Sequence, residues 1–168
     1  MPTKQKWTEA EKLELWGPGP WVDEAERLEW MRHGLVCLMT RNPLVGSLCG
    51  YVGVPPTHPL HGKDRRSVRP LRVHGDVNYA KACDHEAGVC HVVKRGQPDD
   101  LWWFGFDCLH GHDLAPAQVR FFGIDIELLL DKRAAAGMAY RDQQYVVEQI
   151  ELLADQLAIV ATKEQKCL

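Results

Sequence analysis

The spacing of hydrophobic positions divides the chain into three parts. In the middle part, short apolar runs with the length of strands alternate with turns that contain proline, glycine or aspartate. These runs cover residues 35–39, 47–54, 68–80, 89–93 and 101–106. Strands at this spacing, joined by short turns, predict an antiparallel sheet.

The C-terminal part has the spacing of helices. Residues 124–136 predict one helix, which ends at Gly137, and residues 140–162 predict a longer one. Apolar residues in the longer helix recur at steps of four and three: Val146, Ile150, Leu153, Leu157 and Val160. They form one stripe, which we expect to pack on the sheet or, alternatively, to form a coiled-coil seam in a homodimer.

The N-terminal part is polar and is predicted to be helical. Thr8 and Glu11 fit a capping box at the start of a first helix, and residues 22–32 predict a second, with acidic residues in its first turn. Four tryptophans occur in this part: Trp7, Trp16, Trp21 and Trp30. Such residues form an aromatic ligand platform or, more commonly, anchor a terminal segment on a core.

The order of these elements predicts one domain of the α+β class over residues 1–168. We expect a helical N-terminal segment over 1–34, a central antiparallel sheet with a site over 35–116, and a helical part over 117–168 that ends in a long helix. A chain of 168 residues is long enough to bury a core without disulfides.

Composition excludes several classes of protein. Hydrophobic residues make up 45% and charged residues 26% of the chain, as in folded globular proteins and not in disordered ones. The net charge of −3 argues against a broad basic face for duplex nucleic acid. No apolar run reaches the roughly 18 residues of a membrane span, and the N-terminus lacks the apolar core of a signal peptide. We therefore expect a cytoplasmic protein.

Histidine and cysteine are crowded in the middle of the chain. Seven of the eight histidines and three of the six cysteines lie between positions 58 and 112. Without an export signal we expect reduced thiols or metal ligands and not disulfides. Crowded nitrogen and sulfur ligands indicate a site. The alternative is that the histidines occupy polar loops and the thiols serve as small buried hydrophobes.

Four of these residues have the stoichiometry of a tetrahedral zinc site: Cys83, Cys90, His91 and Cys108. Cys83 and Cys90 have six residues between them, more than most zinc knuckles, so a hairpin would have to bring the two thiols together. Cys108 would reach them from a neighbouring strand. We predict about one zinc ion per chain and a lower melting temperature after chelation.

A second group of polar residues follows the most apolar predicted strand. His110 and Asp113 lie in the sequence DCLHGHD directly after Phe106, where a rigid sheet can fix them, and His74 precedes a glycine that leaves room beside its ring. A histidine can bind a metal or transfer a proton, and a carboxylate can orient it. We predict that His74, His110 and Asp113 converge; alternatively, they are separate surface residues and Asp113 caps the next element. No phosphate loop, dinucleotide fingerprint or GxSxG motif is present.

The same motifs carry a resemblance. CGYVGVPPTHPLHGKD, VHGDVNYA, the C…VCHV pair and WWFGFDCLHGHDLAP resemble a group of small uncharacterised proteins encoded by bacteriophages, prophages and bacteria. The likeness covers residues 44–116 and, more loosely, YRDQQYVVEQIELLADQL. In that group HGDVNYA tends to be HGGLTYA, and CLHGHD tends to be CAHAGD. The pattern is matched at His74, Tyr79, Cys108, His110 and Asp113, and it is not matched at His112. The resemblance implies a phage or prophage setting and the bacterial cytoplasm; it implies no activity.

Two functions follow from these observations. The first is a phage accessory protein that binds a host protein or a small ligand, for example an inhibitor of bacterial defence. The second is a small metal-dependent hydrolase that uses His74, His110 and Asp113 with a zinc-bound water as nucleophile. A structural zinc is enclosed by four protein ligands and a catalytic one keeps an open position, so the geometry of the site distinguishes the two.

Overall fold

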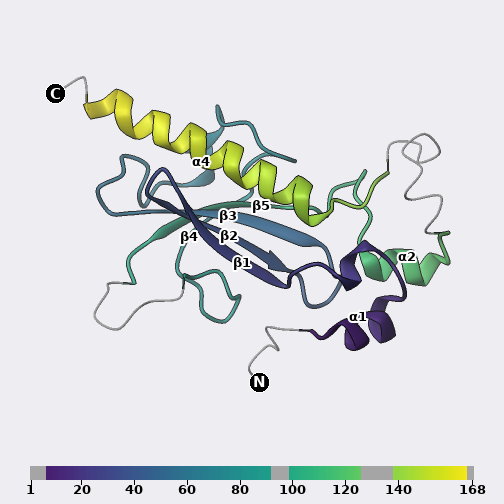
Figure 1. Cartoon of the computed structure of the whole chain (residues 1–168). Coiled ribbons are helices and arrows are strands. Elements are labelled where there is room, and N and C mark those ends of the chain that lie inside the picture. Colours follow the sequence, from purple (N-terminus) through teal and green to yellow (C-terminus); the bar gives the residue numbers. More distant parts are fainter. Residues whose placement is uncertain (1–6, 92–98, 126–137, 166–168) are drawn as a thin grey trace.

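The computed structural model describes residues 7–91, 99–125 and 138–165. Its centre is a five-stranded antiparallel sheet in the order β1-β2-β3-β5-β4 (Figure 1). The strands are β1 (Arg27–Arg32), β2 (Leu35–Arg41), β3 (Leu48–Val54), β4 (Tyr79–Ala82) and β5 (Trp102–Asp107). Together with short N-terminal helices and one long C-terminal helix, this sheet confirms the predicted α+β class.

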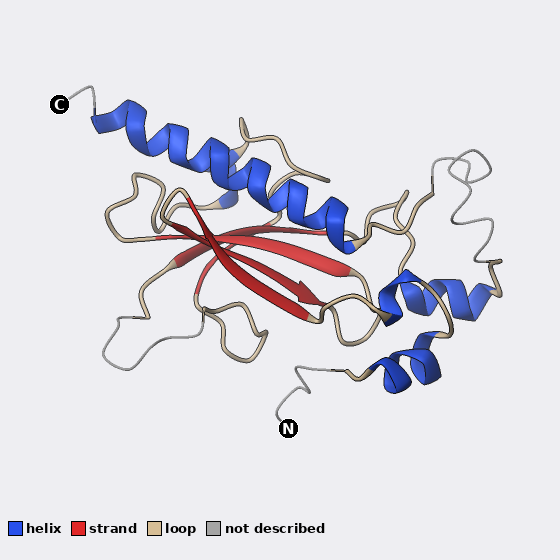
Figure 2. Cartoon of the chain, viewed as in Figure 1, coloured by secondary structure: helices blue, strands red, loops and turns tan. Residues whose placement is uncertain are grey.

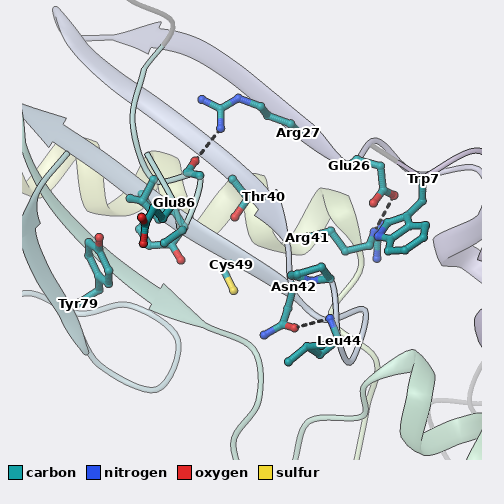
Figure 3. Close-up of a pocket in the computed structure, with 15 residues that line it drawn as sticks. Trp7, Glu26, Arg27, Thr40, Arg41, Asn42, Leu44, Cys49, Tyr79 and Glu86 are labelled. Atoms are coloured by element: carbon teal, nitrogen blue, oxygen red, sulfur yellow. Dashed lines mark hydrogen bonds and ion pairs between the residues drawn. The ribbon is translucent and has the colours of Figure 1, made fainter. Parts of the chain in front are cut away.

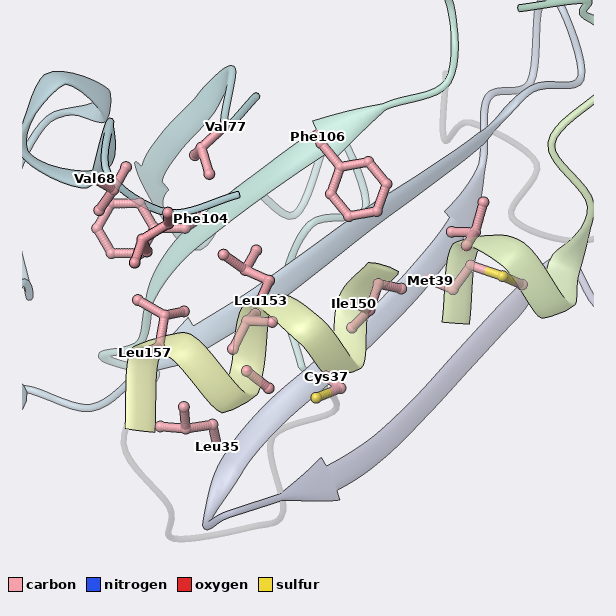
Figure 4. Close-up of a cluster of buried hydrophobic side chains, with 14 of the residues drawn as sticks. Leu35, Cys37, Met39, Val68, Val77, Phe104, Phe106, Ile150, Leu153 and Leu157 are labelled. Atoms are coloured by element: carbon pink, nitrogen blue, oxygen red, sulfur yellow. The ribbon is translucent and has the colours of Figure 1, made fainter. Parts of the chain in front are cut away.

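The long helix α4 (Gln143–Gln165) covers one face of the sheet, over β2 and β3 (Figure 2). Four residues of its predicted apolar stripe are fully buried, namely Val146, Ile150, Leu153 and Leu157. They pack in one cluster with Met39, Phe104 and Phe106 of the sheet (Figure 4). Since the stripe faces its own sheet, it is not available as a coiled-coil seam. A homodimer through this helix stays a prediction, and it would use the other side, where Leu152 and Ile159 are exposed.

Alternation along β5 decides which side chains reach which face. Phe104, Phe106 and the following Cys108 belong to the cluster beneath α4. Trp103 belongs to a separate cluster on the opposite face, with Leu38 and Val89. Successive residues of a strand point to opposite faces, so the even-numbered positions of this segment face α4 and the odd-numbered ones face away.

Helix α1 (Glu9–Trp16) and helix α2 (Pro116–Phe122) lie side by side at one end of the sheet (Figure 1). The capping box at Thr8 and Glu11 is confirmed, since the Thr8 N–H donates to the Glu11 carboxylate and the Glu11 N–H donates to Thr8 Oγ1. Trp16 and Trp21 are buried against Leu114 and Val119. These tryptophans therefore anchor the N-terminal segment.

A buried ionic cluster joins this segment to the sheet. Arg41 of β2, whose side chain is fully buried, donates to Glu26 at 2.9 Å and to Glu24 at 3.0 Å. Lys12 of α1 lies 3.2 Å from the Glu26 carboxylate, and the Tyr140 hydroxyl lies 3.1 Å from Arg41. Every charge in the cluster therefore has a partner of opposite sign, as burial requires.

The predicted helix over 22–32 is wrong, because residues Arg27–Arg32 form β1. Leu28 and Trp30 pack toward the cluster beneath α4, whereas Glu29 between them is exposed. This period of two is the pattern of a strand, and pairing with β2 selects it over the local helical preference.

Other element boundaries also differ from the predictions. The predicted strand over 68–80 is wrong for most of its length: a short 3-10 helix, η2 (Arg65–Val68), leads into turns, and only the last two positions join β4. The predicted strand over 89–93 is reduced to a single bridge between Asp84 and Val89, and positions 92–93 lie outside the described residues. The predicted helix over 124–136 also lies almost entirely outside them. No helix in the part of the chain that the structure describes is long and apolar enough to cross a bilayer.

Candidate functional site

The structure brings His74, His110 and Asp113 together, as predicted. The Oδ2 atom of Asp113 accepts a hydrogen bond from His74 Nε2 at 2.8 Å and from the His110 backbone N–H at 2.9 Å, and it lies 3.2 Å from His110 Nδ1. Its Oδ1 atom accepts from Arg141 Nε at 2.8 Å. His74 comes from the turn before β4, and the other two predicted residues come from the loop after β5. We call these three residues the His–Asp centre.

Glycine at position 75 is required by this arrangement. Gly75 has a φ of +63°, and Asp76 after it has a φ of +67°. A Cβ atom at Gly75 would also overlap the His110 ring. The left-handed turn and the close approach of the ring both exclude a larger residue, which explains the room beside His74 that the sequence indicated.

Helix α4 fixes the orientation of the His74 ring. The backbone N–H of His74 donates to Gln149 Oε1 at 3.0 Å, and His74 Nδ1 lies 2.9 Å from the Tyr145 hydroxyl. An ionised Asp113 only accepts hydrogen bonds, so His74 Nε2 is the donor in this pair. Sequence reasoning missed Arg141, Tyr145 and Gln149. For Tyr145 and Gln149 the spacing of four residues within α4 was the available signal, since it aligns them beside the apolar stripe; Arg141 precedes the helix.

Asp113 carries the negative charge of the centre. Its side chain is only 1% exposed. Burial would raise the pKa of this carboxyl, but hydrogen bonds from Arg141, the His110 N–H and His74 lower the pKa to about 2. Asp113 is therefore ionised at every physiological pH.

Cys108 lies beside this charge and stays a neutral thiol. Burial, and after it the charge of Asp113, raises the pKa of Cys108 far above its ordinary value. A neutral buried thiol is neither a nucleophile nor a ready metal ligand. Cys37 and Cys49 are free and buried as well, and burial raises the pKa of each to about 12. These three thiols behave as small hydrophobic residues.

The donor atoms of the His–Asp centre suit a metal ion. One ligand atom from each of the three residues lies within 4.8 Å of the other two. An ion at His74 Nε2 and Asp113 Oδ2 would replace the hydrogen bond between these two atoms, and the His74 proton would then lie on Nδ1 and be donated to Tyr145. Arg141 holds the second oxygen of Asp113, and such outer contacts are the support that metal ligands in proteins usually have. The His110 side chain is 36% exposed, so solvent reaches the centre at this residue. Three protein ligands leave further coordination positions open.

The predicted zinc ligands Cys83, Cys90 and His91 form a second cluster, on the other face of the sheet. Cys83 and Cys90 are joined by a disulfide, so the expectation of reduced thiols is wrong for this pair. His91 Nδ1 lies 3.9 Å from Cys83 Sγ, and Asp99 Oδ1 lies 3.0 Å from Cys90 Sγ. Ligand atoms from Cys83, Cys90, His91 and Asp99 lie within 4.8 Å of one another. We call these four residues the Cys cluster.

Cys108 is not part of the Cys cluster, which corrects the predicted zinc ligand set. Position 108 has the parity of Phe104 and Phe106 and faces α4, whereas Cys83 packs with Trp103 on the opposite face. Asp99 takes the fourth place. No sequence signal marked Asp99, because only the folded structure brings this residue next to Cys90.

A cavity of about 330 Å³ lies on the face of the sheet that bears the Cys cluster (Figure 3). Tyr51 and Tyr79 line it from the sheet, and the turn over residues 86–89 lines it from above the strands. Arg27 of β1 donates to the Gly88 carbonyl at 2.8 Å and also to the Cys90 carbonyl, which ties this turn to the sheet. The hydroxyl of Tyr79 is buried and has no hydrogen-bond partner in the described part of the chain.

The two faces of the sheet thus carry different chemistry. The face beneath α4 ends in the His–Asp centre, which has nitrogen and oxygen donors. The opposite face carries the Cys cluster and the cavity. Comparisons with known proteins add no family to this description, since no family model, no curated protein and no solved structure matches the chain.

Proposed function

We propose that the protein is a small metal-dependent hydrolase whose metal, expected to be zinc, is held by His74, His110 and Asp113. The observation that carries the proposal is the convergence of three donor atoms within 4.8 Å, with the outer atoms of His74 and Asp113 already hydrogen-bonded. Hydrogen bonds to the outer atoms of metal ligands orient these ligands for an ion. An ion pair with only a structural role does not need them. Three ligands with a solvent-exposed edge favour a catalytic site over a structural one.

His74, His110 and Asp113 would hold the divalent ion, which when bound would supply Lewis-acid chemistry for the attack of water on a carbonyl or phosphoryl group. The protein's own groups supply the rest. Asp113 keeps its charge at neutral pH and fixes both imidazoles, and the partly exposed His110 faces the side from which a substrate enters. The guanidinium of Arg141 adds a positive charge next to the centre, which favours an anionic substrate such as a phosphate ester.

Zinc titration of the oxidised protein tests the proposal, because the disulfide removes Cys83 and Cys90 as competing ligands. Protein purified without an affinity-tag metal should bind one zinc ion per chain and then hydrolyse members of a panel of chromogenic phosphate and carboxylate esters. His110→Ala should abolish both properties. His61→Ala is the matched control, since the His61 ring lies away from the centre, 2.8 Å from the Asp100 carbonyl and beside Trp102. Absence of zinc binding by the oxidised wild type would refute the metal, and binding without turnover of any ester would refute the hydrolase.

A second candidate function is a phage or prophage accessory protein that binds a host protein or a small ligand in the bacterial cytoplasm, for instance to counteract bacterial defence. The resemblance of the sequence motifs supports the setting. The cavity supports the binding role, because its volume of about 330 Å³ is in the range of small-molecule pockets and aromatic residues line it. Thermal-shift screening of small molecules, with Tyr79→Ala as the variant that removes part of the aromatic wall of the cavity, separates this function from the hydrolase.

A further inference from the structure

We propose that Cys83, Cys90, His91 and Asp99 form a redox-controlled zinc site, which binds Zn²⁺ only after the Cys83–Cys90 disulfide is reduced. Two thiolates, one imidazole nitrogen and one carboxylate oxygen are ligands that zinc accepts in a tetrahedral site. All four lie within 4.8 Å of one another in the oxidised state. The proposal uses no residue of the His–Asp centre and stands or falls independently of the proposed hydrolase.

The surroundings of the two sulfur atoms suit thiolate ligands. Trp103 Nε1 donates to Cys83 Sγ at 3.3 Å, and an N–H donor stabilises the thiolate form. His85 Nε2 lies 2.6 Å from Asp99 Oδ2, so the carboxylate is held by one oxygen and can offer the other. This is again the outer support of metal ligands. A disulfide alone needs none of these polar neighbours.

The hairpin that carries the two cysteines does not depend on the disulfide. Asp84 and Val89 exchange two backbone hydrogen bonds of 2.9 Å, and the Ala87 N–H donates to Asp84 Oδ1 at 2.9 Å. Arg27, at the start of strand β1, donates a hydrogen bond to the Gly88 carbonyl. These bonds remain when the S–S bond is broken, so the two thiols stay adjacent and the ligand set is already in place.

The chemical balance is that of thiol–disulfide exchange. A dithiol reductant gives two electrons and two protons to the disulfide and becomes a cyclic disulfide itself, which leaves two thiols on the protein. Zn²⁺ then displaces the two thiol protons. In the reverse direction a small disulfide accepts the two electrons, the Cys83–Cys90 bond forms again, and the ion leaves.

The turn between the two cysteines also lines the cavity, through residues 86–89. When a zinc ion replaces the disulfide bond, the sulfur atoms of Cys83 and Cys90 move further apart, and these two residues flank the turn. The redox state of the Cys cluster therefore acts directly on the wall of the cavity.

The test compares one chain in two redox states, with Zn²⁺ and Co²⁺ as probes. The full-length protein, reduced with a phosphine under anaerobic conditions and freed from it, should bind one more metal ion per chain than the oxidised protein. Bound Co²⁺ should show a thiolate-to-metal charge-transfer absorption, and addition of a small disulfide should abolish it. An equal number of metal ions in both states, or a cobalt spectrum without the thiolate band, would overturn the proposal.

Variants identify the ligands. His91→Ala and Asp99→Ala should each lose the additional ion in the reduced state, while circular dichroism of the oxidised variants verifies that they fold. Cys108→Ser is the matched control and should retain the ion, because Cys108 lies on the other face of the sheet. Loss of the additional ion in Cys108→Ser and its retention in Asp99→Ala would show that the ligand set is wrong.

Discussion

Replacement of Asp113 by asparagine isolates the charge on which the His–Asp centre depends. The substitution keeps the shape of the side chain and removes its negative charge. Asp113 Oδ2 accepts from two donors, His74 Nε2 and the His110 backbone N–H. Asparagine can accept at one of its two positions only, so an NH₂ group must face either Arg141 or these two donors.

The lowered pKa of Asp113 determines how much stability the Asp113→Asn substitution should remove. A carboxyl whose pKa falls from 3.8 to about 2 on folding contributes about 2.5 kcal/mol of stability at neutral pH, since a tenfold change in proton affinity is worth about 1.4 kcal/mol. Because the pKa is lower in the folded state, this contribution is complete above the unfolded value of 3.8 and is lost as the pH falls toward 2. We therefore expect Asp113→Asn to lower the free energy of unfolding by about 2–3 kcal/mol at pH 7.

Urea denaturation of both proteins between pH 3 and pH 7 measures this effect, with the disulfide kept intact. The difference in unfolding free energy should be constant from about pH 7 to pH 5 and should shrink below pH 4, where the carboxyl of the unfolded wild type takes up a proton while that of the folded protein stays ionised. Asp76→Asn serves as the control, because Asp76 is exposed in a left-handed turn that asparagine tolerates. A difference that is equally large at pH 3 and pH 7, or absent at both, would refute the assignment of a stabilising charge to Asp113.

Three further predictions concern other parts of the fold. Leu153→Ala should destabilise the protein by about 2–5 kcal/mol in urea denaturation, because this fully buried side chain leaves a cavity beneath α4; an unchanged midpoint would contradict its place in the core. Gly75→Ala should displace the His110 ring, which the chemical shifts of the imidazole protons would report; an unchanged histidine spectrum would show that the turn adapts. Arg41→Met should lower the stability by about 3–5 kcal/mol, because it leaves buried carboxylates such as Glu26 without this partner; addition of the Glu26→Gln change should recover part of the loss.

Much of the sheet could be predicted from the sequence because its signals are local. Residues 35–39, 47–54 and 101–106 are apolar runs bounded by turn residues, and each lies within a strand or overlaps one closely. The strand β1 could not be predicted in the same way. Its outward positions include both the charged Glu29 and the apolar Met31, so the alternation is broken, and only the contact of Leu28 and Trp30 with the sheet shows which period applies. Tertiary pairing decides such segments and local preference does not.

The His–Asp centre was predictable in part for a different reason. His110 and Asp113 follow a buried strand directly, and the end of a strand fixes the residues after it. Tyr145 and Gln149 could not be assigned to the centre, because the crossing of α4 over the sheet depends on packing throughout the core. Cys108 was assigned to the wrong face of the sheet. Its true face follows from strand alternation only once Phe104 and Phe106 are known to face the helix.

The alternation along β5 restricts how this chain can change in length. A single inserted or deleted residue within Trp102–Asp107 would exchange the two faces downstream of it, which would turn Phe106 away from α4 and move the start of the loop that carries His110. An insertion of two residues would preserve the faces and merely shift the loop along the sheet. Natural or engineered length variants of the protein should therefore carry their insertions outside β5, and changes inside β5 should occur only in steps of two residues.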